Sequence, residues 1–246
     1  MPSASPAVFP YSRLFACILA ATLAFTLASS SASASKPKKS ANAAAPKPAG
    51  VETAAASAAV PSAPPAGTSP MADLKKSNAA LKKLFAKTSP SWSPEHDAKR
   101  SEMRKIVTGF LDFEELGRRA LARHWEGLSP KQRIEFVGVL RDLIERNYIR
   151  QVHGQPNYEM HFRKEDIAAN EGTVDATLET SNQGKKVTVE MEYKLLWKGE
   201  RWLVYDVITD EQSMLENYRA EFNKIITKES FDALLKRMKK RLEKPE

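Results

Sequence analysis

The residues best suited to metal or thiol chemistry are few and scattered in this chain. It has one cysteine, and its four histidines never fall four residues apart on one predicted helix, the spacing that places two imidazoles on one face. Any further metal ligands would have to be carboxylates from distant positions. The sequence therefore predicts no metal site, no disulfide and no cysteine-ligated zinc. The residues concerned are Cys17, His96, His124, His153 and His161.

Motifs for nucleotide or acyl chemistry are also missing. The sequence contains no glycine-rich phosphate loop, no dinucleotide fingerprint, no G-x-S-x-G elbow and no H-E-x-x-H helix. We therefore expect neither enzyme activity nor a cofactor. One alternative stays open, in which a small pocket uses Tyr205, Asp206 or His161 as an acid or base.

Asp206 stands among apolar residues on a predicted strand. Burying an unpaired carboxylate costs several kcal/mol, so we expect it to have a partner. Arg219 is the first candidate, and the interpretation is a structural ion pair between Asp206 and Arg219.

The first seventy residues have the composition of targeting and linker segments. Arg13 precedes an apolar run over 14–28, and small residues follow up to Ala34, which predicts a cleaved signal peptide over 1–34. Residues 35–70 are rich in Ala, Pro, Ser and Lys and have too little apolar surface to fold, so they are interpreted as a disordered tether. The predicted folded domain is 71–246.

The chain is basic, with 38 Lys and Arg against 30 Asp and Glu, a net charge of +8. This balance favours anionic partners. A secreted chain meets little nucleic acid, so we expect no nucleic-acid partner, while transient contact with a membrane surface stays open. The basic residues of the last predicted helix are equally well explained as a solvated face; they are Lys236, Arg237, Lys239, Lys240 and Arg241.

Capping residues mark the starts of four predicted helices, at Ser93, Asp112, Ser129 and Ser213. The last three have Glu or Gln three residues later, the spacing of a capping box. A further helix is predicted before Pro90 and another after Ser230. Between Tyr158 and Asp210 the apolar period changes to two residues, which predicts strands. The predicted strands centre on 158–162, 174–178, 187–195 and 202–208.

Short turns at 182–184 and 198–200 join successive strands. Such turns favour an antiparallel meander over a parallel crossover. The order of helices, sheet and helices predicts an α+β fold with a four-stranded antiparallel sheet.

Five segments of this chain form a recognisable series. They are Arg201–Val207, Ser213–Phe222, Phe113–Leu116, Ala120–Trp125 and Leu128–Phe136. Together they resemble the MlaC family. The resemblance extends over about 74–242, and the pair W-x-x-Y-D-V and N-Y-R-x-x-F is fairly specific. One departure is Asp210-Glu211-Gln212, where many relatives have a glycine and an apolar residue.

The resemblance implies an NTF2-like sheet wrapped by helices around an apolar cavity for lipid. It also implies a periplasmic phospholipid carrier that moves lipid between the outer membrane and an inner-membrane ABC transporter. The implied partners are an outer-membrane lipoprotein complex and the MCE-domain protein of that transporter. The implied cargo is a phospholipid, with a hopanoid or another envelope lipid as an alternative.

The cavity candidates are apolar and aromatic residues on the predicted inward faces. They come from the long helix, the central strand and the helix after the sheet, and are Leu140, Ile144, Tyr148, Val189, Met191, Tyr193, Leu215, Tyr218 and Phe222. Periodicity alone explains each of them equally well as ordinary core. An NTF2-like enzyme or a structural adaptor remain rival interpretations. A catalytic pocket gathers polar groups, a lipid cavity is almost uniformly apolar, and an adaptor binds no ligand.

Overall fold

The computed structural model describes residues 63–85, 95–152, 158–182 and 185–243. The predicted signal peptide and most of the predicted tether, like the predicted cap Ser93, lie outside these residues. No helix in the described part is long and apolar enough to cross a bilayer. The elements follow the chain in this order: α1 (Pro70–Phe85), α2 (Glu95–Phe110), α3 (Phe113–Leu121), the 3-10 helix η2 (Ala122–His124), α4 (Pro130–Val152), β1 (Tyr158–Ala168), β2 (Glu171–Asn182), β3 (Lys185–Trp197), β4 (Trp202–Thr209), β5 (Gln212–Ser213), α5 (Met214–Lys228) and α6 (Phe231–Glu243).

The strands form one antiparallel sheet in the order β1-β2-β3-β4-β5. The four predicted strands are confirmed, and the predicted turn at 198–200 is closed by a hydrogen bond from Lys198 N to Arg201 O at 3.0 Å. The two-residue strand β5 was not predicted. It pairs with β4 across a turn at Asp210 and Glu211, which have φ angles of 46° and 66°. Two residues with positive φ suit the tight turns of β-hairpins, so this departure from the family pattern still closes a hairpin.

Polar side chains fix where the helices begin. Asp112 and Ser213 accept the backbone N–H three residues on, at 2.9 and 3.0 Å, and confirm two predicted N-caps. Ser129 and Gln132 form the third predicted capping pair. An additional cap, Ser69, starts α1 and donates its hydroxyl to Glu165 of β1 at 2.7 Å. This bond attaches the start of α1 to the sheet.

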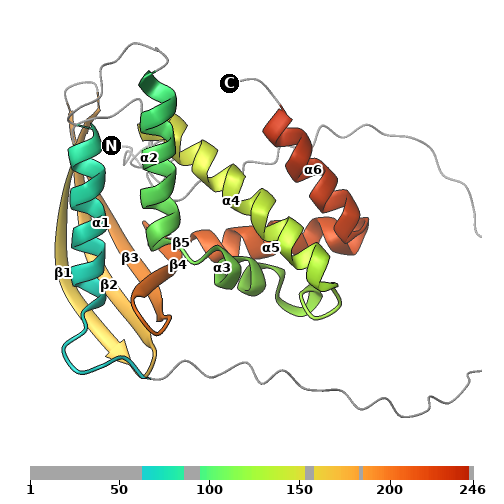
Figure 1. The fold of residues 1–246 in the computed structure, drawn as a ribbon, viewed down its shortest axis with the longest axis horizontal. Coiled ribbons are helices and arrows are strands. Elements are labelled where there is room, and N and C mark those ends of the chain that lie inside the picture. Colours follow the sequence, from blue (N-terminus) through green and yellow to red (C-terminus); the bar gives the residue numbers. More distant parts are fainter. Residues whose placement is uncertain (1–62, 86–94, 153–157, 183–184, 244–246) are drawn as a thin grey trace, which may run out of the picture. The chain divides into compact units, whose positions relative to one another are not determined.

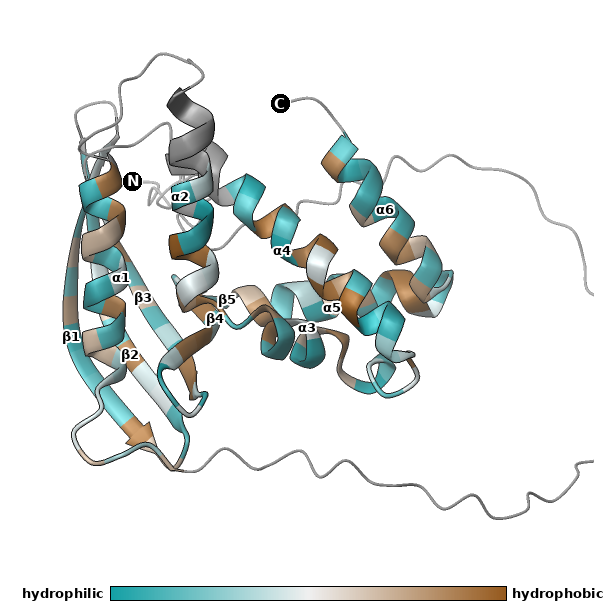
Figure 2. Cartoon of the chain, viewed as in Figure 1, coloured by the Kyte–Doolittle hydropathy of each residue, from teal (hydrophilic) through white to brown (hydrophobic). Residues whose placement is uncertain are grey.

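Two groups of helices pack on the sheet (Figure 1). Helix α1 packs against β1 and β2, and α2 packs against α1, β4 and α4. Helices α3, α4, α5 and α6 pack on one another, and α3 and α5 also contact β4. Apolar residues recur along the helices of both groups (Figure 2). The α+β prediction is therefore confirmed, with helices preceding and following the sheet in the chain.

The cores of the two groups differ in kind. The inner face of the sheet is lined by buried aliphatic residues such as Val174, Leu178 and Leu195. The helical group is centred on Phe222, whose ring packs edge-on against Phe136. The same ring is stacked on Tyr218, with 5.4 Å between the two ring centroids. Aromatic pairs of this geometry add to the stability gained from burial alone.

Candidate functional site

A pocket of about 560 Å³ lies between α1, α2 and the start of β4. We call it the α1–α2 pocket. Three buried side chains, Leu74, Phe110 and Trp202, contribute to its lining, and we call them the floor. The charged side chains Lys76, Glu200 and Arg201 also line it and are exposed, and we call them the rim. The remaining lining includes small and aliphatic residues of both helices. The pocket thus combines a few buried apolar side chains with about as many charged and polar ones, and it opens to solvent. Its lining is therefore more polar than the almost uniformly apolar one expected of a lipid cavity.

Backbone contacts hold α1 against the sheet at this pocket. Asp73 accepts the backbone N–H of Trp202 at 3.0 Å, which joins the first turn of α1 to the start of β4. Gly172 of β2 lies close by, and a Cβ at this position would meet Pro70 and Trp202 at 3.1 Å. Glycine is therefore required here for the close approach of the helix to the strand.

Helix α2 forms the other wall and is held at its C-terminal end. Leu111 makes a parallel β-bridge with Val204, and Asp112 N donates to Val204 O at 2.7 Å. On the side facing α4, Arg104 forms an ion pair of 2.6 Å with Glu145, which is 1% exposed. Burial raises the pKa of the Glu145 carboxyl even though Arg104 acts in the opposite direction.

The nine predicted cavity residues are buried wherever their side chains are described, but none of them lines the α1–α2 pocket. They fall into two places. Val189, Met191 and Tyr193 lie on the inner face of β3, whereas Leu140, Ile144, Leu215, Tyr218 and Phe222 lie in the helical group. The side chain of Tyr148 is outside the described part. Contact of these residues with lipid stays a prediction.

The predicted ion pair between Asp206 and Arg219 is wrong. Asp206 is 2% exposed and accepts from the hydroxyl of Ser213 at 2.7 Å and from Leu215 N at 2.9 Å. Arg219 donates instead to the backbone oxygen of Arg119 and to Glu216. Both donors lie at the beginning of α5, seven and nine residues after Asp206 in the chain. The β4–β5 turn brings them back to the carboxylate.

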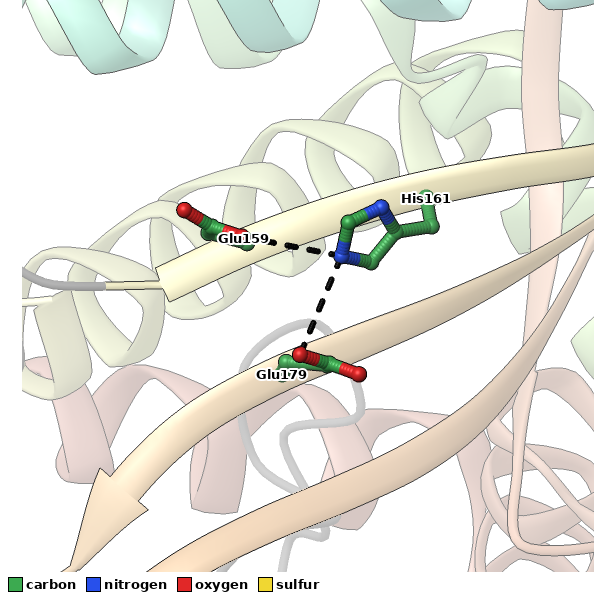
Figure 3. A group of neighbouring side chains, drawn as sticks. All are labelled: Glu159, His161 and Glu179. Carbon is green, nitrogen blue, oxygen red and sulfur yellow. Dashed lines mark ion pairs between the residues drawn. The ribbon is translucent and has the colours of Figure 1, made fainter.

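The three residues considered as acid or base are not gathered in one site. The guanidinium carbon of Arg119 lies 4.0 Å from the ring centroid of Tyr205. Asp206 accepts a hydrogen bond from Leu215 N at the start of α5. His161 is on the outer face of the sheet, between Glu159 and Glu179 at 3.7 and 3.9 Å (Figure 3).

The cluster in Figure 3 combines one imidazole with two carboxylates, which are residue types that can bind a cation. Their ligand atoms lie within 4.8 Å of one another. Glu159 and Glu179 are directly opposed across β1 and β2, so the register of the strands assembles the cluster. His161 is half exposed, and Lys186 already pairs with Glu179 at 2.8 Å. None of these residues lines the α1–α2 pocket.

Comparison with known proteins identifies the chain's relatives. Residues 75–240 match the MlaC protein family. The chain belongs to the MlaC family. It is 22% identical over 150 residues to the intermembrane phospholipid transport system binding protein MlaC of Haemophilus influenzae, covering 59% of this chain and 69% of that protein. The family is non-enzymatic, as the missing motifs predicted.

The fold of this MlaC family member also matches a solved structure. The phospholipid-binding protein from Ralstonia solanacearum, determined in complex with a phospholipid, superposes with a TM-score of 0.57 at 18% identity. The match covers 71% of this chain and 97% of the other. It confirms the predicted antiparallel sheet with flanking helices as the architecture of this MlaC family member.

Sequence reasoning missed the residues that line the α1–α2 pocket. Gly109 and Trp202 stand on elements that were predicted, but nothing in their periodicity separates a pocket wall from filled core. The rim residue Glu200 belongs to the predicted turn at 198–200, and Arg201 begins one of the segments that carry the family resemblance; neither was predicted to line a pocket. An indirect signal was available in Gly172, a glycine two residues before the strand predicted over 174–178, since a glycine in a strand often marks a close approach of another part of the chain.

Stability of this MlaC family member is expected to depend on pH through Glu221 on α5. Burial raises the pKa of Glu221 from 4.5 to about 7, and Arg241 and Lys224 offset only part of this effect. Between these values the folded state holds a proton that the unfolded chain releases, so the contribution of Glu221 to stability is highest below pH 4.5 and falls as pH rises toward 7. Glu221→Gln should therefore be more stable than wild type by about 1–2 kcal/mol at pH 8 and nearly equal to it at pH 4.5, after allowing for partial exposure.

Urea denaturation at the two pH values measures this difference. Glu114→Gln, an exposed glutamate of α3, is the matched control and should change stability at neither pH. An equal effect of Glu221→Gln at both pH values would refute the assignment.

Proposed function

We propose that this chain is a periplasmic phospholipid carrier that holds acyl chains in the α1–α2 pocket. The observation that carries the proposal is a pocket of about 560 Å³ with a buried apolar floor, in a chain of the MlaC family. This volume falls in the range of about 300–1,000 Å³ that is usual for small-molecule sites. The relatives named above, one a phospholipid transport protein and one solved with a phospholipid, support the choice of cargo.

The physical need for such a pocket follows from the cargo. A diacyl lipid has about thirty methylenes, and exposing them to water costs ~0.8 kcal/mol each, on the order of 25 kcal/mol in all. A carrier must therefore cover most of the tails, while the polar headgroup can remain at the entrance. The floor residues and the charged rim provide this division.

The inner face of the sheet is the proposed continuation of the acyl-chain site. Val189, Met191 and Tyr193 lie on this face in β3, beside the strand that α1 covers. Their burial supports a role as the deeper wall. The aromatic cluster around Phe222 supports a different role, a packed scaffold that holds α4, α5 and α6 together.

The location and partners proposed here come from the sequence and the family resemblance. The predicted signal peptide over 1–34 supports export to the periplasm, ahead of the predicted tether over 35–70. The chain has no motif for using nucleotide energy. Net direction of transport is therefore proposed to come from partners, an outer-membrane lipoprotein complex and an inner-membrane ABC transporter with an MCE-domain protein.

The experiment that tests the function is native mass spectrometry of the purified full chain, followed by organic extraction. The expected result is a complex with one diacyl phospholipid that extraction releases. Protein that carries no lipid, and takes up none from phospholipid vesicles, would refute the function. An enzyme with a small polar substrate or an adaptor would give that second result.

A further inference from the structure

Helix α1 presents four lysines to solvent on one side. The helix buries Leu74, Leu81 and Leu84 against the rest of the domain, and its exposed residues recur three, four and seven positions apart. This spacing places the exposed residues together on the opposite side of an α-helix. We call this side the lysine face, and it consists of Ala72, Lys75, Lys76, Ala79, Lys82 and Lys83.

The positive charge of the lysine face is not neutralised within the part of the chain that the structure describes. None of its four lysines forms an ion pair or a hydrogen bond there. The one acidic residue of α1, Asp73, accepts from Trp202 N instead. Glu165 of β1, beside the start of α1, accepts from Ser69 and from Met71 N. The carboxylates at this helix are therefore used in holding it in place.

Two of the lysines lie over aromatic rings of β1. The Nζ atom of Lys75 is 6.0 Å from the ring centroid of Phe162, and that of Lys82 is 5.6 Å from the ring centroid of Tyr158. A ring attracts a cation but carries no net charge. Both ammonium groups therefore keep their charge for a partner.

The basic residues of α6 are used differently. Lys239 pairs with Glu135 of α4, and Arg237 pairs with Glu229. Two exposed acidic residues also stand among the basic residues of this helix, Asp232 and Glu243. The charge of α6 is thus partly neutralised by its own surroundings, which supports the interpretation of this helix as a solvated face.

The lysine face borders the α1–α2 pocket. Lys76 belongs to both, and its neighbours Ser77 and Ala80 line the pocket from α1. A flat anionic partner on the lysine face would therefore lie beside the opening of the pocket.

We infer that the lysine face docks the domain on an anionic membrane surface. That this docking brings the pocket to its lipid source rests on the proposed function. Anionic headgroups attract clustered basic residues without requiring a fixed geometry. Protein interfaces are instead enriched in aromatic residues and Arg and depleted in Lys. Because only alanines separate the lysines of this face, an anionic membrane fits it better than an acidic protein does.

Vesicle sedimentation tests the inference on the full chain. Wild type should bind vesicles of equal parts phosphatidylglycerol and phosphatidylcholine, and bind vesicles of phosphatidylcholine alone much less. The binding should fall steeply between about 50 and 300 mM NaCl, because salt screens exposed charges. Each lysine near an anionic surface strengthens binding about fivefold. A binding constant at least about fiftyfold weaker is therefore expected for the variant that combines Lys75→Gln, Lys76→Gln, Lys82→Gln and Lys83→Gln.

The matched control removes the same charge from exposed lysines of α4, α5 and α6. It combines Lys131→Gln, Lys224→Gln, Lys236→Gln and Lys240→Gln. This variant should bind within about threefold of wild type, because its lysines lie outside the lysine face. Circular dichroism should find both variants folded, since Gln is nearly as good a helix former as Lys.

Undiminished binding by the α1 variant would overturn the inference, as would equal weakening in the control. Wild type that does not bind the phosphatidylglycerol vesicles would also overturn it and leave an acidic protein as the partner of this face. A chain that carries lipid but does not bind these vesicles would leave the proposed function standing. A chain that binds the vesicles through α1 but carries no lipid would instead overturn the proposed function and keep the docking surface.

Discussion

Gly109→Trp should lower lipid binding by more than about tenfold and leave the fold intact. Gly109 lines the α1–α2 pocket from α2, and a Cβ at this position meets no described heavy atom within 4 Å. An indole there would occupy the pocket, and glycine is the poorer helix former of the two residues, so the helix should not suffer. Excluding only two or three methylenes, at ~0.8 kcal/mol each, lowers lipid binding by more than about tenfold.

Gly138→Trp is the matched control. Gly138 is also a helical glycine with no described heavy atom within 4 Å of a built Cβ, but it lies on α4 and does not line the pocket. Native mass spectrometry should find normal lipid occupancy in this variant, and circular dichroism should find both variants folded. Equal lipid loss in the two variants would mean that the acyl chains do not depend on the α1–α2 pocket.

Asp206→Ala should be the most destabilising single substitution proposed for this chain. The carboxylate is buried and receives two hydrogen bonds, from Ser213 and from Leu215 N. Bonds to a charged acceptor contribute about 1.5–3 kcal/mol each, and removing the acceptor also leaves a buried N–H unpaired. The free energy of unfolding in urea should fall by about 3–5 kcal/mol.

Two further variants distinguish the hydrogen bonds of Asp206 to Ser213 and Leu215 N from the Asp206–Arg219 ion pair that the sequence predicted. Ser213→Ala removes one bond to Asp206 and the N-cap of α5, so it should cost about 2–4 kcal/mol. Arg219→Ala should cost about 1–2 kcal/mol, because it removes an exposed pair with Glu216 and one partly buried hydrogen bond to Arg119 O. A loss in Arg219→Ala as large as in Asp206→Ala would contradict the assignment of Asp206 to the start of α5.

Local patterns were sufficient to predict most elements of the fold. The alternation over 187–195 reflects a strand with one buried face, and Asp112, Ser129 and Ser213 satisfy backbone N–H groups that any helix leaves open. The short strand β5 carries no such pattern, because two residues are too few to show a period. The cap at Ser69 depends on Glu165, almost one hundred residues away, and only the folded chain brings them together.

The candidate site was harder to predict because a pocket is a property of packing between elements. Leu140 and Phe222 have the apolar spacing expected of a cavity wall, and the same spacing allows Phe222 to pack against Phe136 in the helical group. Trp202 has a similar pattern and lines the pocket instead. The partner of Asp206 was missed for a related reason. The β4–β5 turn brings the backbone N–H of Leu215 to the carboxylate, and a backbone donor cannot be recognised from residue types.

A crystal structure with a brominated phospholipid tests most directly the claim that acyl chains occupy the α1–α2 pocket. The anomalous signal of bromine on the acyl chains should lie beside Phe110 and Trp202, with extension toward the inner face of β3. Bromine located among Leu140, Tyr218 and Phe222, away from α1 and α2, would contradict the claim.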